Sequence, residues 1–330
     1  MKTELAMLYR HETFDRSRAR TSLLHILDGN VNPSIIASFL TVYNMRQPTI
    51  AELQGFTDAL MESCIAVDLD AADAIDIVGT GGDGKNTFNI STLSALVVAA
   101  AGIRVIKHGN YGSTSVSGSS NVLEKIGYQF SGDRSVLKRQ LDATNICFLH
   151  APLFHPLMDR VKHIRKDLSM QTIFNLLGPL VNPAAPGKQV LGVSHHSHIR
   201  KYQYLLDETD KGYSIVHAMD GYDEISLTGS FKVIGRNGAK LYYPEDIGMQ
   251  KIQPQCIEAG NSVDEAATIF LNILQGIGTL QQEMVVIINS AFAIQCAHPD
   301  KGIDMCIDMA KTALYSGKAY QTLKKSIALS

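Results

Sequence analysis

The chain has 330 residues, 45% of them hydrophobic and 19% charged, and its formal net charge is −2. This length suits one large domain or two smaller ones, and the near-neutral charge gives no general electrostatic reason to expect nucleic acid or an anionic membrane as a partner. The five cysteines are scattered and form no C-x-x-C pair, which argues against a disulfide framework and a zinc site and favours a reducing, cytoplasmic location.

The first part of the chain, residues 1–72, is predicted to be helical. No sustained apolar region follows the N-terminal lysine, so no signal peptide is expected, and no apolar run is long enough to span a bilayer. Asn32 stands before Pro33 as an N-cap stands before the first helical residue, and Thr49 and Glu52 have the spacing of a capping box. We therefore expect a small all-helical N-terminal domain.

From about residue 73 to residue 330 the pattern changes to strands that alternate with helices. This alternation predicts an α/β domain with a mostly parallel sheet and flanking helices. Ligands of such sheets bind in the loops at the carboxyl ends of the strands. The segment 155–186 interrupts the alternation with a helix and a loop punctuated by prolines. The expected strands are residues 75–78, 103–107, 145–149, 190–193 and 213–217.

A glycine-rich loop, with four glycines between positions 79 and 84, follows the first expected strand. Glycines let backbone N–H groups turn closely around a bulky anion, and the hydroxyl and amide side chains that come next add further donors. The apolar run 93–101 predicts a helix whose N-terminal end attracts negative charge to the same place. Lys107 ends the next strand and would hold a phosphate as a point charge. We interpret the stretch 76–127 as a cradle for phosphate and diphosphate groups.

Gly79, Gly81 and Gly84 also fit the G-x-G-x-x-G pattern of dinucleotide-binding proteins. In those proteins the helix begins at the third glycine, and an acidic residue at the end of the next strand binds the ribose. Here several polar residues separate Gly84 from the apolar helix, and the next strand ends in Lys107. The sequence therefore disfavours a nicotinamide cofactor. A turn without a ligand is disfavoured too, because tight turns alone rarely combine so many glycines and hydroxyls.

Blocks of residues in a recognisable order run along almost the whole chain. They are Gly79-Thr-Gly-Gly-Asp83, Thr87-Phe-Asn-Ile-Ser-Thr92, Lys107-His-Gly-Asn110, Gly118-Ser119, His155-Pro156, Arg165, Phe174-Asn-Leu-Leu-Gly-Pro-Leu180 and Gly221-Tyr-Asp-Glu224. In these blocks the chain resembles anthranilate phosphoribosyltransferase, an enzyme family of tryptophan biosynthesis. It departs from the family's usual pattern at Tyr111, where arginine is frequent, at Thr114, where serine is usual, at Asn121, where aspartate is common, and at Gln171, where arginine is common.

The resemblance implies Mg²⁺-dependent transfer of the 5-phosphoribosyl group from 5-phosphoribosyl 1-diphosphate to anthranilate, which gives N-(5-phosphoribosyl)anthranilate and diphosphate. It also implies a homodimer formed through the small helical domain, which would comprise residues 1–72 and part of about 165–186. The α/β domain, residues 73–330, would bind the phosphoribosyl diphosphate. No nucleic acid and no membrane are expected as partners.

Site residues for the phosphoribosyl diphosphate and the metal follow from the same resemblance. Mg²⁺ usually takes one or two carboxylates, a demand that the adjacent pair Asp223 and Glu224 fits, and the resemblance adds Ser91 as a metal ligand. The residues expected to bind the phosphoribosyl diphosphate are Gly79, Gly82, Asp83, Thr87, Asn89, Ile90, Ser91, Thr92, Lys107, His108, Gly109, Asn110, Ser115 and Ser119.

The acceptor carries a carboxylate, which calls for a bidentate arginine. The family position for that arginine is Arg165, and the resemblance places Gly79, Asn110 and His155 beside it as further contacts to anthranilate. No residue is identified as a general base. An aromatic amine that attacks an oxocarbenium-like carbon needs little prior proton abstraction, so positioning could supply most of the rate.

Two other functions stay open. A pyrimidine nucleoside phosphorylase, which resembles this family in fold, would use inorganic phosphate and a nucleoside, but Arg165 and the block 174–180 weigh against it. A non-catalytic relative that binds nucleic acid would have a basic surface and damaged substrate loops. This chain is slightly acidic and its loops are intact.

Overall fold

A computed structural model describes residues 1–112 and 116–330, so Thr114 and the expected site residue Ser115 lie outside the described residues. The chain forms two compact units, each described here by itself. A helical unit comprises residues 1–66 and 151–183, and an α/β unit comprises residues 67–150 and 184–330. The segment that returns to the helical unit therefore begins at residue 151, whereas the sequence placed it at about 165–186.

The helical unit contains helices with the start signals that the sequence predicts. The Asn32 side chain accepts a hydrogen bond from the backbone N–H of Ser34 (2.9 Å), with Pro33 as the first helical residue. Thr49 and Glu52 form the reciprocal bonds of a capping box. The helices are α1 (Lys2–Tyr9), α2 (Arg16–Leu27), α3 (Pro33–Met45), α4 (Ile50–Ser63), α8 (Ala151–Phe154), α9 (Asp159–Leu168) and α10 (Ile173–Leu177), with short 3₁₀ turns at Pro156–Met158 and Gly178–Leu180.

A buried carboxylate joins three parts of this unit. The side chain of Glu52 is fully buried and accepts hydrogen bonds from both terminal nitrogens of Arg46 (2.6 and 2.9 Å). It also accepts hydrogen bonds from the backbone N–H groups of Thr49 (2.8 Å) and Phe14 (3.1 Å) and from the Tyr43 hydroxyl (3.1 Å). Burial alone would raise the pKa of Glu52, but the hydrogen bonds from Arg46, Thr49 and Phe14 outweigh it, and the pKa is lowered overall.

Replacing this residue, Glu52→Gln, is expected to lower the free energy of unfolding by about 2 kcal/mol, because it leaves the half-buried Arg46 without its partner. The folded pKa lies below the ordinary value, so the contribution of Glu52 is fully present above that value and is lost as the pH falls through the folded pKa. Calorimetric unfolding between pH 3 and pH 7 measures both effects. The matched control is Glu62→Gln, in the exposed pair with Arg20, which should change stability by no more than about 0.5 kcal/mol. Equal effects of the two variants would contradict this account.

The α/β unit is organised around one sheet, and the described residues place seven strands in it in the order β3-β2-β1-β4-β5-β6-β7. The five strands from β3 to β5 pair in parallel, and β6 and β7 pair antiparallel at one edge. The expected fold class, a mostly parallel sheet with flanking helices and a small helical N-terminal domain, is confirmed. The strands are β1 (Ile75–Gly79), β2 (Val105–Gly109), β3 (Ile146–His150), β4 (Lys188–Gly192), β5 (Gly212–Ala218), β6 (Phe231–Gly235) and β7 (Gly238–Tyr242).

The strand order reverses between β1 and β4. From β1 the chain continues to β2 and β3 on one side, and β4 and β5 extend the sheet on the other. In open α/β sheets a crevice forms at the carboxyl ends of the two strands that flank such a reversal, because the connections leave in opposite directions. The carboxyl ends at this point are Gly79 of β1 and Gly192 of β4, which are paired in register.

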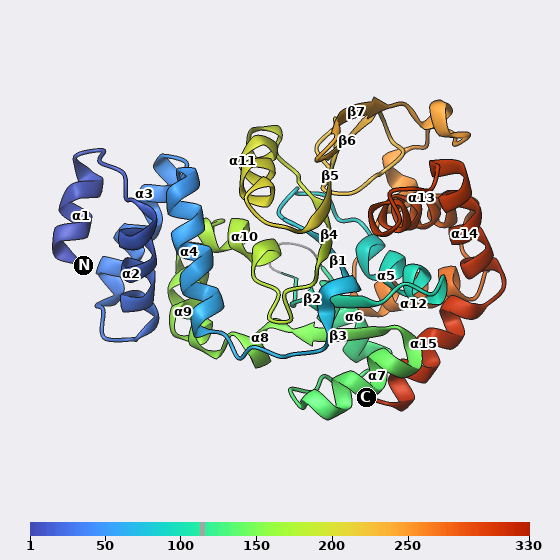
Figure 1. Cartoon of the computed structure of the whole chain (residues 1–330), viewed down its shortest axis with the longest axis horizontal. Coiled ribbons are helices and arrows are strands. Elements are labelled where there is room, and N and C mark those ends of the chain that lie inside the picture. Colours follow the sequence, from blue (N-terminus) through green and yellow to red (C-terminus); the bar gives the residue numbers. More distant parts are fainter. Residues whose placement is uncertain (113–115) are drawn as a thin grey trace. The chain divides into compact units, whose positions relative to one another are not determined.

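Helices cover both faces of the sheet. Figure 1 shows α5, α13 and α14 on one side of the strands and α11 on the other. Most residues of α5 are buried, as expected for a helix between the sheet and an outer helical layer. The helices are α5 (Ile90–Ala100), α6 (Ser119–Lys125), α7 (Arg134–Thr144), α11 (His196–Asp207), α12 (Val263–Leu274), α13 (Leu280–Ala297), α14 (Ile303–Tyr315) and α15 (Lys318–Ala328), with 3₁₀ turns at Ala71–Asp73, Pro244–Ile247 and Pro254–Ile257.

The antiparallel hairpin of β6 and β7 was not predicted. Its strands are joined by the two residues Arg236 and Asn237, before Gly238 with φ +122°. Every residue of β7 is at least partly exposed, so the strand lacks the apolar run that marks a buried strand. Among the described residues, no helix combines the length and apolar character that crossing a bilayer would require.

Candidate functional site

The loop after β1 has a backbone that only glycine adopts readily. Gly81, Gly82 and Gly84 have φ values of +62°, +68° and +69°, in the left-handed region. A Cβ atom added at Gly81 or Gly84 would meet no atom within 4 Å, so these glycines are required by backbone conformation and not by crowding. The loop therefore turns its backbone N–H groups through a tight curve at the carboxyl end of the sheet, as the sequence predicts for an anion cradle.

Asp223 fills the space beside that loop. Its Oδ2 accepts a hydrogen bond from the Gly81 backbone N–H (2.7 Å). A Cβ added at Gly79 would lie 2.3 Å from Asp223 Oδ2, and one added at Gly192 would lie 1.6 Å from the Asp223 carbonyl oxygen. Because Gly79 at the end of β1 and Gly192 at the end of β4 have no side chain, Asp223 can lie at the point where the strand order reverses.

Glu224 and Lys107 meet at the first turn of α5. Glu224 Oε1 accepts a hydrogen bond from the Ser91 backbone N–H (3.0 Å). Lys107 is the middle residue of β2, which runs on to Gly109, so the expected strand end at Lys107 is wrong. Its ammonium donates to the Ile77 carbonyl oxygen and to Ser91 Oγ (3.4 Å). The helix begins at Ile90, three residues before the predicted start, with Asn89 in the N-cap position but without a capping bond from its side chain. Its first turn therefore belongs to the site.

Three carboxyl groups share this region. Burial, together with the Asp223 carboxylate, raises the pKa of Asp83 to about 6. Burial also raises the pKa of Asp223, and burial and the neighbouring carboxylates raise the pKa of Glu224 well above its ordinary value. Burial lowers the pKa of Lys107, although the carboxylates of Asp76, Glu224 and Asp223 oppose the effect. The site thus gathers more negative than positive side chains in a low-dielectric setting, an arrangement typical of functional sites.

This set of donors fits a hard divalent cation. Mg²⁺ prefers oxygen ligands and completes its shell with water and phosphate oxygens around one or two carboxylates. Asp223 and Glu224 supply carboxylate oxygens, and a bound cation would favour the charged forms that burial disfavours. Within residues 1–112 and 116–330, no group of three or more histidine, cysteine, aspartate or glutamate side chains is arranged to hold a metal ion.

A second loop lies after β2 and ends at α6. Ser119 Oγ donates a hydrogen bond to the Asn110 carbonyl oxygen (3.2 Å), and a Cβ added at Gly109 would lie 2.3 Å from that hydroxyl oxygen. Asn121 Oδ1 accepts from the backbone N–H groups of Gly112 and Gly118, both at 2.9 Å. Asn121, one of the departures from the family pattern, therefore closes the two ends of this loop.

Other predicted residues line the start of α5. The Asn89 side chain donates to the Ser117 carbonyl oxygen (3.0 Å), which ties the two loops together. Asn89 Oδ1 and Thr92 Oγ1 are buried, and neither has a hydrogen-bond partner among the described residues. Thr87 pairs with Glu258 through an isolated antiparallel bridge. Two unsatisfied buried polar atoms at this point favour a polar ligand that would complete their bonds.

His108 and Ile90 are placed less favourably for side-chain contact with a ligand. His108 is buried within β2, where its backbone N–H donates to Asp76 Oδ1 (3.4 Å). The side chain of Ile90 is fully buried in the core. The backbone N–H of Ile90 is also engaged, because it donates to the Phe88 carbonyl oxygen (2.6 Å).

Sequence reasoning missed Thr80 and Ser194. Their hydroxyl groups lie 3.2 Å apart, the Ser194 backbone N–H donates to Thr80 Oγ1 (3.3 Å), and Ser194 Oγ donates to the Gly81 carbonyl oxygen (3.3 Å). These bonds attach the glycine-rich loop to the carboxyl end of β4. The position of Ser194, directly after an expected strand, is the signal that could have identified it.

Arg165 and His155 belong to the helical unit. Burial lowers the pKa of Arg165, whose guanidinium lies over the Phe174 ring (5.3 Å to the centroid) and donates to Asn175 Oδ1 (3.5 Å). His155 Nε2 lies 2.9 Å from the Val181 carbonyl oxygen, and burial lowers the pKa of the imidazole. The contact to a carbonyl oxygen fixes the His155 ring with its proton on Nε2.

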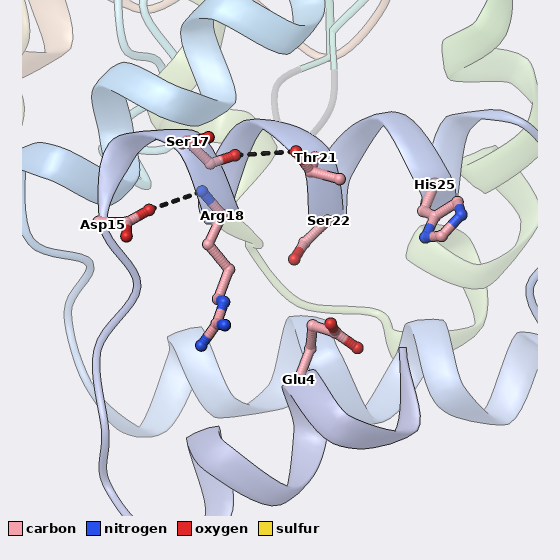
Figure 2. Close-up of a pocket in the computed structure, with 7 residues that line it drawn as sticks. All are labelled: Glu4, Asp15, Ser17, Arg18, Thr21, Ser22 and His25. Atoms are coloured by element: carbon pink, nitrogen blue, oxygen red, sulfur yellow. Dashed lines mark hydrogen bonds between the residues drawn. The ribbon is translucent and has the colours of Figure 1, made fainter.

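A polar recess of about 300 Å³ lies in the helical unit beside α1 and α2, and no predicted site residue lines it (Figure 2). Within it, Asp15 accepts a hydrogen bond from the Arg18 backbone N–H (2.7 Å), and the Thr21 hydroxyl donates to the Ser17 carbonyl oxygen (3.0 Å). These are helix-capping and intrahelical bonds, which are local to α2. The recess is lined by Glu4, Asp15, Ser17, Arg18, Thr21, Ser22 and His25.

Two family models match successive parts of the chain, and the α/β model also spans residues 151–183, which belong to the helical unit of the structure. Residues 71–320 match the family model described as the α/β domain of a glycosyl transferase family, and residues 2–64 match the helical bundle domain of the same family. A protein of Bacteroides thetaiotaomicron named anthranilate phosphoribosyltransferase is 49% identical over 329 residues, which cover 100% of this chain and 99% of the relative. A protein of Flavobacterium johnsoniae with the same name is 48% identical over 334 residues, which cover 100% of both chains.

Solved structures are similar over nearly the same extent. Anthranilate phosphoribosyltransferase from Thermus thermophilus superposes with a TM-score of 0.91 at 29% identity and covers 98% of both chains. The enzyme from Saccharomyces cerevisiae, in complex with PRPP and Mg, superposes with a TM-score of 0.88 at 27% identity and covers 95% of this chain and 93% of that one. From the family models and from relatives at nearly half identity over the full length, this chain belongs to the anthranilate phosphoribosyltransferase family.

Proposed function

We propose that this chain transfers the 5-phosphoribosyl group from 5-phosphoribosyl 1-diphosphate to anthranilate. In this reaction the bond between ribose C1 and the diphosphate oxygen breaks and diphosphate leaves with the electron pair. A bond forms between C1 and the anthranilate nitrogen, which loses one proton. The single observation that carries the proposal is the convergence of Lys107 of β2, Ser91 of α5 and the pair Asp223 and Glu224 beside the carboxyl end of β1.

The glycine-rich loop and the start of α5 would hold the donor substrate. The diphosphate would be contacted by the backbone groups of Gly79, Gly82 and Asp83, since the loop that contains them is curved and allows close approach. Lys107 would neutralise charge on a phosphate. Diphosphate gains negative charge as it leaves, so groups fixed around it stabilise the transition state more than the ground state. The remaining proposed contacts are Thr87, Asn89, Ile90, Ser91, Thr92, His108, Gly109, Asn110, Ser115 and Ser119.

Mg²⁺ is the proposed cofactor, with Asp223, Glu224 and Ser91 as the residues that would hold it. A bound Mg²⁺ would supply charge neutralisation at the diphosphate oxygens. The contribution of the chain is to hold the two carboxylates ready, through the N–H groups of Gly81 and Ser91. These hydrogen bonds fix the orientation of carboxylates that burial would otherwise disfavour as anions.

The acceptor is proposed to bind through Arg165, whose guanidinium can take the anthranilate carboxylate as a bidentate partner. Its position over the Phe174 ring orients the guanidinium plane. Gly79, Asn110 and His155 are the further proposed contacts. No general base is assigned, and the Nε2 atom of His155 is already bonded to the Val181 carbonyl oxygen (2.9 Å).

Replacing the proposed carboxylate anchor, Arg165→Lys, is expected to raise KM for anthranilate about tenfold or more, since lysine keeps the charge but loses the bidentate fork. KM for 5-phosphoribosyl 1-diphosphate should change by less than about twofold, because the change removes no proposed contact to it. Steady-state kinetics with each substrate varied in turn measures both constants. Lys166→Met is the matched control, because Lys166 is a neighbouring basic residue of α9 with an exposed side chain. An unchanged KM for anthranilate in Arg165→Lys would remove Arg165 from the acceptor site.

The reaction itself is tested by product analysis. The chain is incubated with both substrates and Mg²⁺, and mass spectrometry should find one product that contains anthranilate joined to a phosphoribosyl group, with one equivalent of diphosphate released. A parallel incubation with uridine and inorganic phosphate tests the nucleoside phosphorylase alternative. Release of uracil without any phosphoribosylanthranilate would overturn the proposal, and binding of single-stranded DNA at moderate salt without either reaction would favour the nucleic-acid-binding relative.

We also propose that the protein is a cytoplasmic homodimer that uses its helical unit as the interface. Large apolar side chains exposed on that unit support an interface, among them Tyr9, Met45 and Met170. Light scattering coupled to size exclusion should give a mass near twice 36.0 kDa, and a mass near 36.0 kDa at micromolar concentration would contradict the dimer.

The cytoplasmic location is supported by the cysteines, because all five are free thiols, which suits a reducing compartment.

A further inference from the structure

The carboxylates Asp223 and Glu224 lie in the loop 219–230, which connects β5 to β6 and is not itself part of a strand. The next residue, Ile225, is fully buried, so its backbone N–H and C=O are removed from water and need partners. Leu227, two residues further on, has a φ of +59°, a conformation that a branched side chain rarely adopts. A loop with these properties keeps its shape only where surrounding contacts determine it.

One side chain on α13 supplies both partners. Asn289 Oδ1 accepts a hydrogen bond from the Ile225 backbone N–H (3.0 Å), and Asn289 Nδ2 donates to the Ile225 carbonyl oxygen (2.8 Å). The same Nδ2 donates to the Val285 carbonyl oxygen one turn earlier in the helix (2.8 Å), which fixes the amide plane. The side-chain amide therefore acts toward Ile225 as a neighbouring strand would.

On their other side the two carboxylates are held by the sheet and by α5. Gly81 N–H binds Asp223, and Ser91 N–H binds Glu224. Close packing at Gly79 and Gly192 leaves no room for Asp223 to shift toward the strands. The loop thus lies between a fixed sheet edge and a long core helix, and Asn289 is the polar group that joins it to the helix.

We infer that Asn289 is a positioning residue for the proposed Mg²⁺ and diphosphate site, acting through the backbone of Ile225 on Asp223 and Glu224. The inference rests on the proposed function. An amide is needed because the two bonds run in opposite directions, one accepted and one donated. Residues that orient ligating carboxylates typically change metal affinity or activity about 10- to 100-fold when they are removed.

The test uses Asn289→Ala and Asn289→Gln, with Ser290→Ala as the matched control. Ser290 is a fully buried neighbour on α13 whose hydroxyl bonds within its own helix, to the Val286 carbonyl oxygen (2.7 Å). In Asn289→Ala we expect kcat to fall about tenfold and the Mg²⁺ concentration for half-maximal rate to rise about tenfold, with KM for anthranilate within about twofold of the parent. Asn289→Gln keeps the donor and the acceptor and should recover part of both losses, and Ser290→Ala should leave the Mg²⁺ dependence unchanged.

A purely structural role would lower the folded fraction without changing the Mg²⁺ dependence of the molecules that remain folded. An unchanged Mg²⁺ dependence in folded Asn289→Ala would therefore overturn the inference and leave the proposed function standing. If that variant does not fold, the nearly isosteric Asn289→Asp, which can still accept from Ile225 N–H but cannot donate to its carbonyl, takes its place with the same criterion. Absence of phosphoribosyl transfer in the parent protein would overturn both the proposed function and the inference.

Discussion

Changing Asp223→Asn and Glu224→Gln together is expected to lower kcat about a thousandfold or more, because the two carboxylates are the proposed protein ligands of Mg²⁺ and the charge on the departing diphosphate would lose its counterion. The amides keep the shape of the side chains, so the loop and its hydrogen bonds from Gly81 and Ser91 should persist. Raising Mg²⁺ should not restore the rate. Initial rates across a wide range of Mg²⁺ concentrations measure the effect.

The thermal stability of the double variant should not fall with its kcat, and is expected to stay equal or rise. Burial raises the pKa values of Asp83, Asp223 and Glu224, and neighbouring carboxylates add to the effect at Asp83 and Glu224. Without Mg²⁺ these groups therefore destabilise the fold as the pH rises through their folded pKa values, which for Asp83 is about 6. The double variant should therefore unfold at an equal or higher temperature than the parent protein at pH 8 and should lose less stability between pH 5 and pH 8.

The matched control for the double variant is Glu245→Gln with Asp246→Asn, an exposed acidic pair in the same unit. It should keep parent-like kcat and parent-like Mg²⁺ dependence. Near-normal activity in the Asp223 and Glu224 variant over the same range would show that the metal assignment is wrong. If kcat also fell strongly in the control, the net negative charge of the unit, and not these two metal ligands, would determine the rate.

The second large effect is expected from Lys107→Met. Lys107 is 3% exposed, and its ammonium lies between the end of β1 and the first turn of α5. Methionine fills a similar volume without charge, so kcat should fall about a hundredfold and KM for 5-phosphoribosyl 1-diphosphate should rise. The variant also removes the cation that opposes the raised pKa values of Asp223 and Glu224. The acid limb of the rate profile should therefore move to higher pH.

The control for Lys107→Met is Lys211→Met. Lys211 is another lysine whose pKa burial lowers, but it precedes β5 and so lies at the amino end of the sheet, away from the loops of the site. Steady-state kinetics from pH 5 to pH 9 on both variants separates the two cases. Equal kcat values and equal pH profiles would contradict a phosphate-binding role for Lys107.

Much of the α/β unit could be predicted because its signals are local. The five parallel strands are short apolar runs between turn residues, and each expected range overlaps the strand found, as 75–78 does with β1. The glycine-rich loop can be recognised in the sequence because Gly81, Gly82 and Gly84 have left-handed φ values, which few residues other than glycine adopt. In the helical unit, the capping box at Thr49 depends on residues three apart.

The parts that could not be predicted depend on partners distant in sequence. Thr80 and Ser194 meet because β1 and β4 are neighbours in a sheet whose order is not the order of the chain. Asn289 is one of several polar residues in a largely buried helix, and its partner Ile225 lies 64 residues away. Nothing local distinguishes these side chains from solvated ones. The start of the returning segment at residue 151 is likewise decided by packing, because the chain there passes directly from β3 into α8.

The most direct test of the central claim is the loss of anthranilate fluorescence after the protein is mixed with 5-phosphoribosyl 1-diphosphate and Mg²⁺. We expect a decay that requires the protein, both substrates and the metal, stops on addition of EDTA and resumes when Mg²⁺ is restored in excess. A folded protein that produces no decay with every component present would contradict the proposed reaction. A decay that continues unchanged in EDTA would contradict the proposed role of Asp223 and Glu224 as metal ligands.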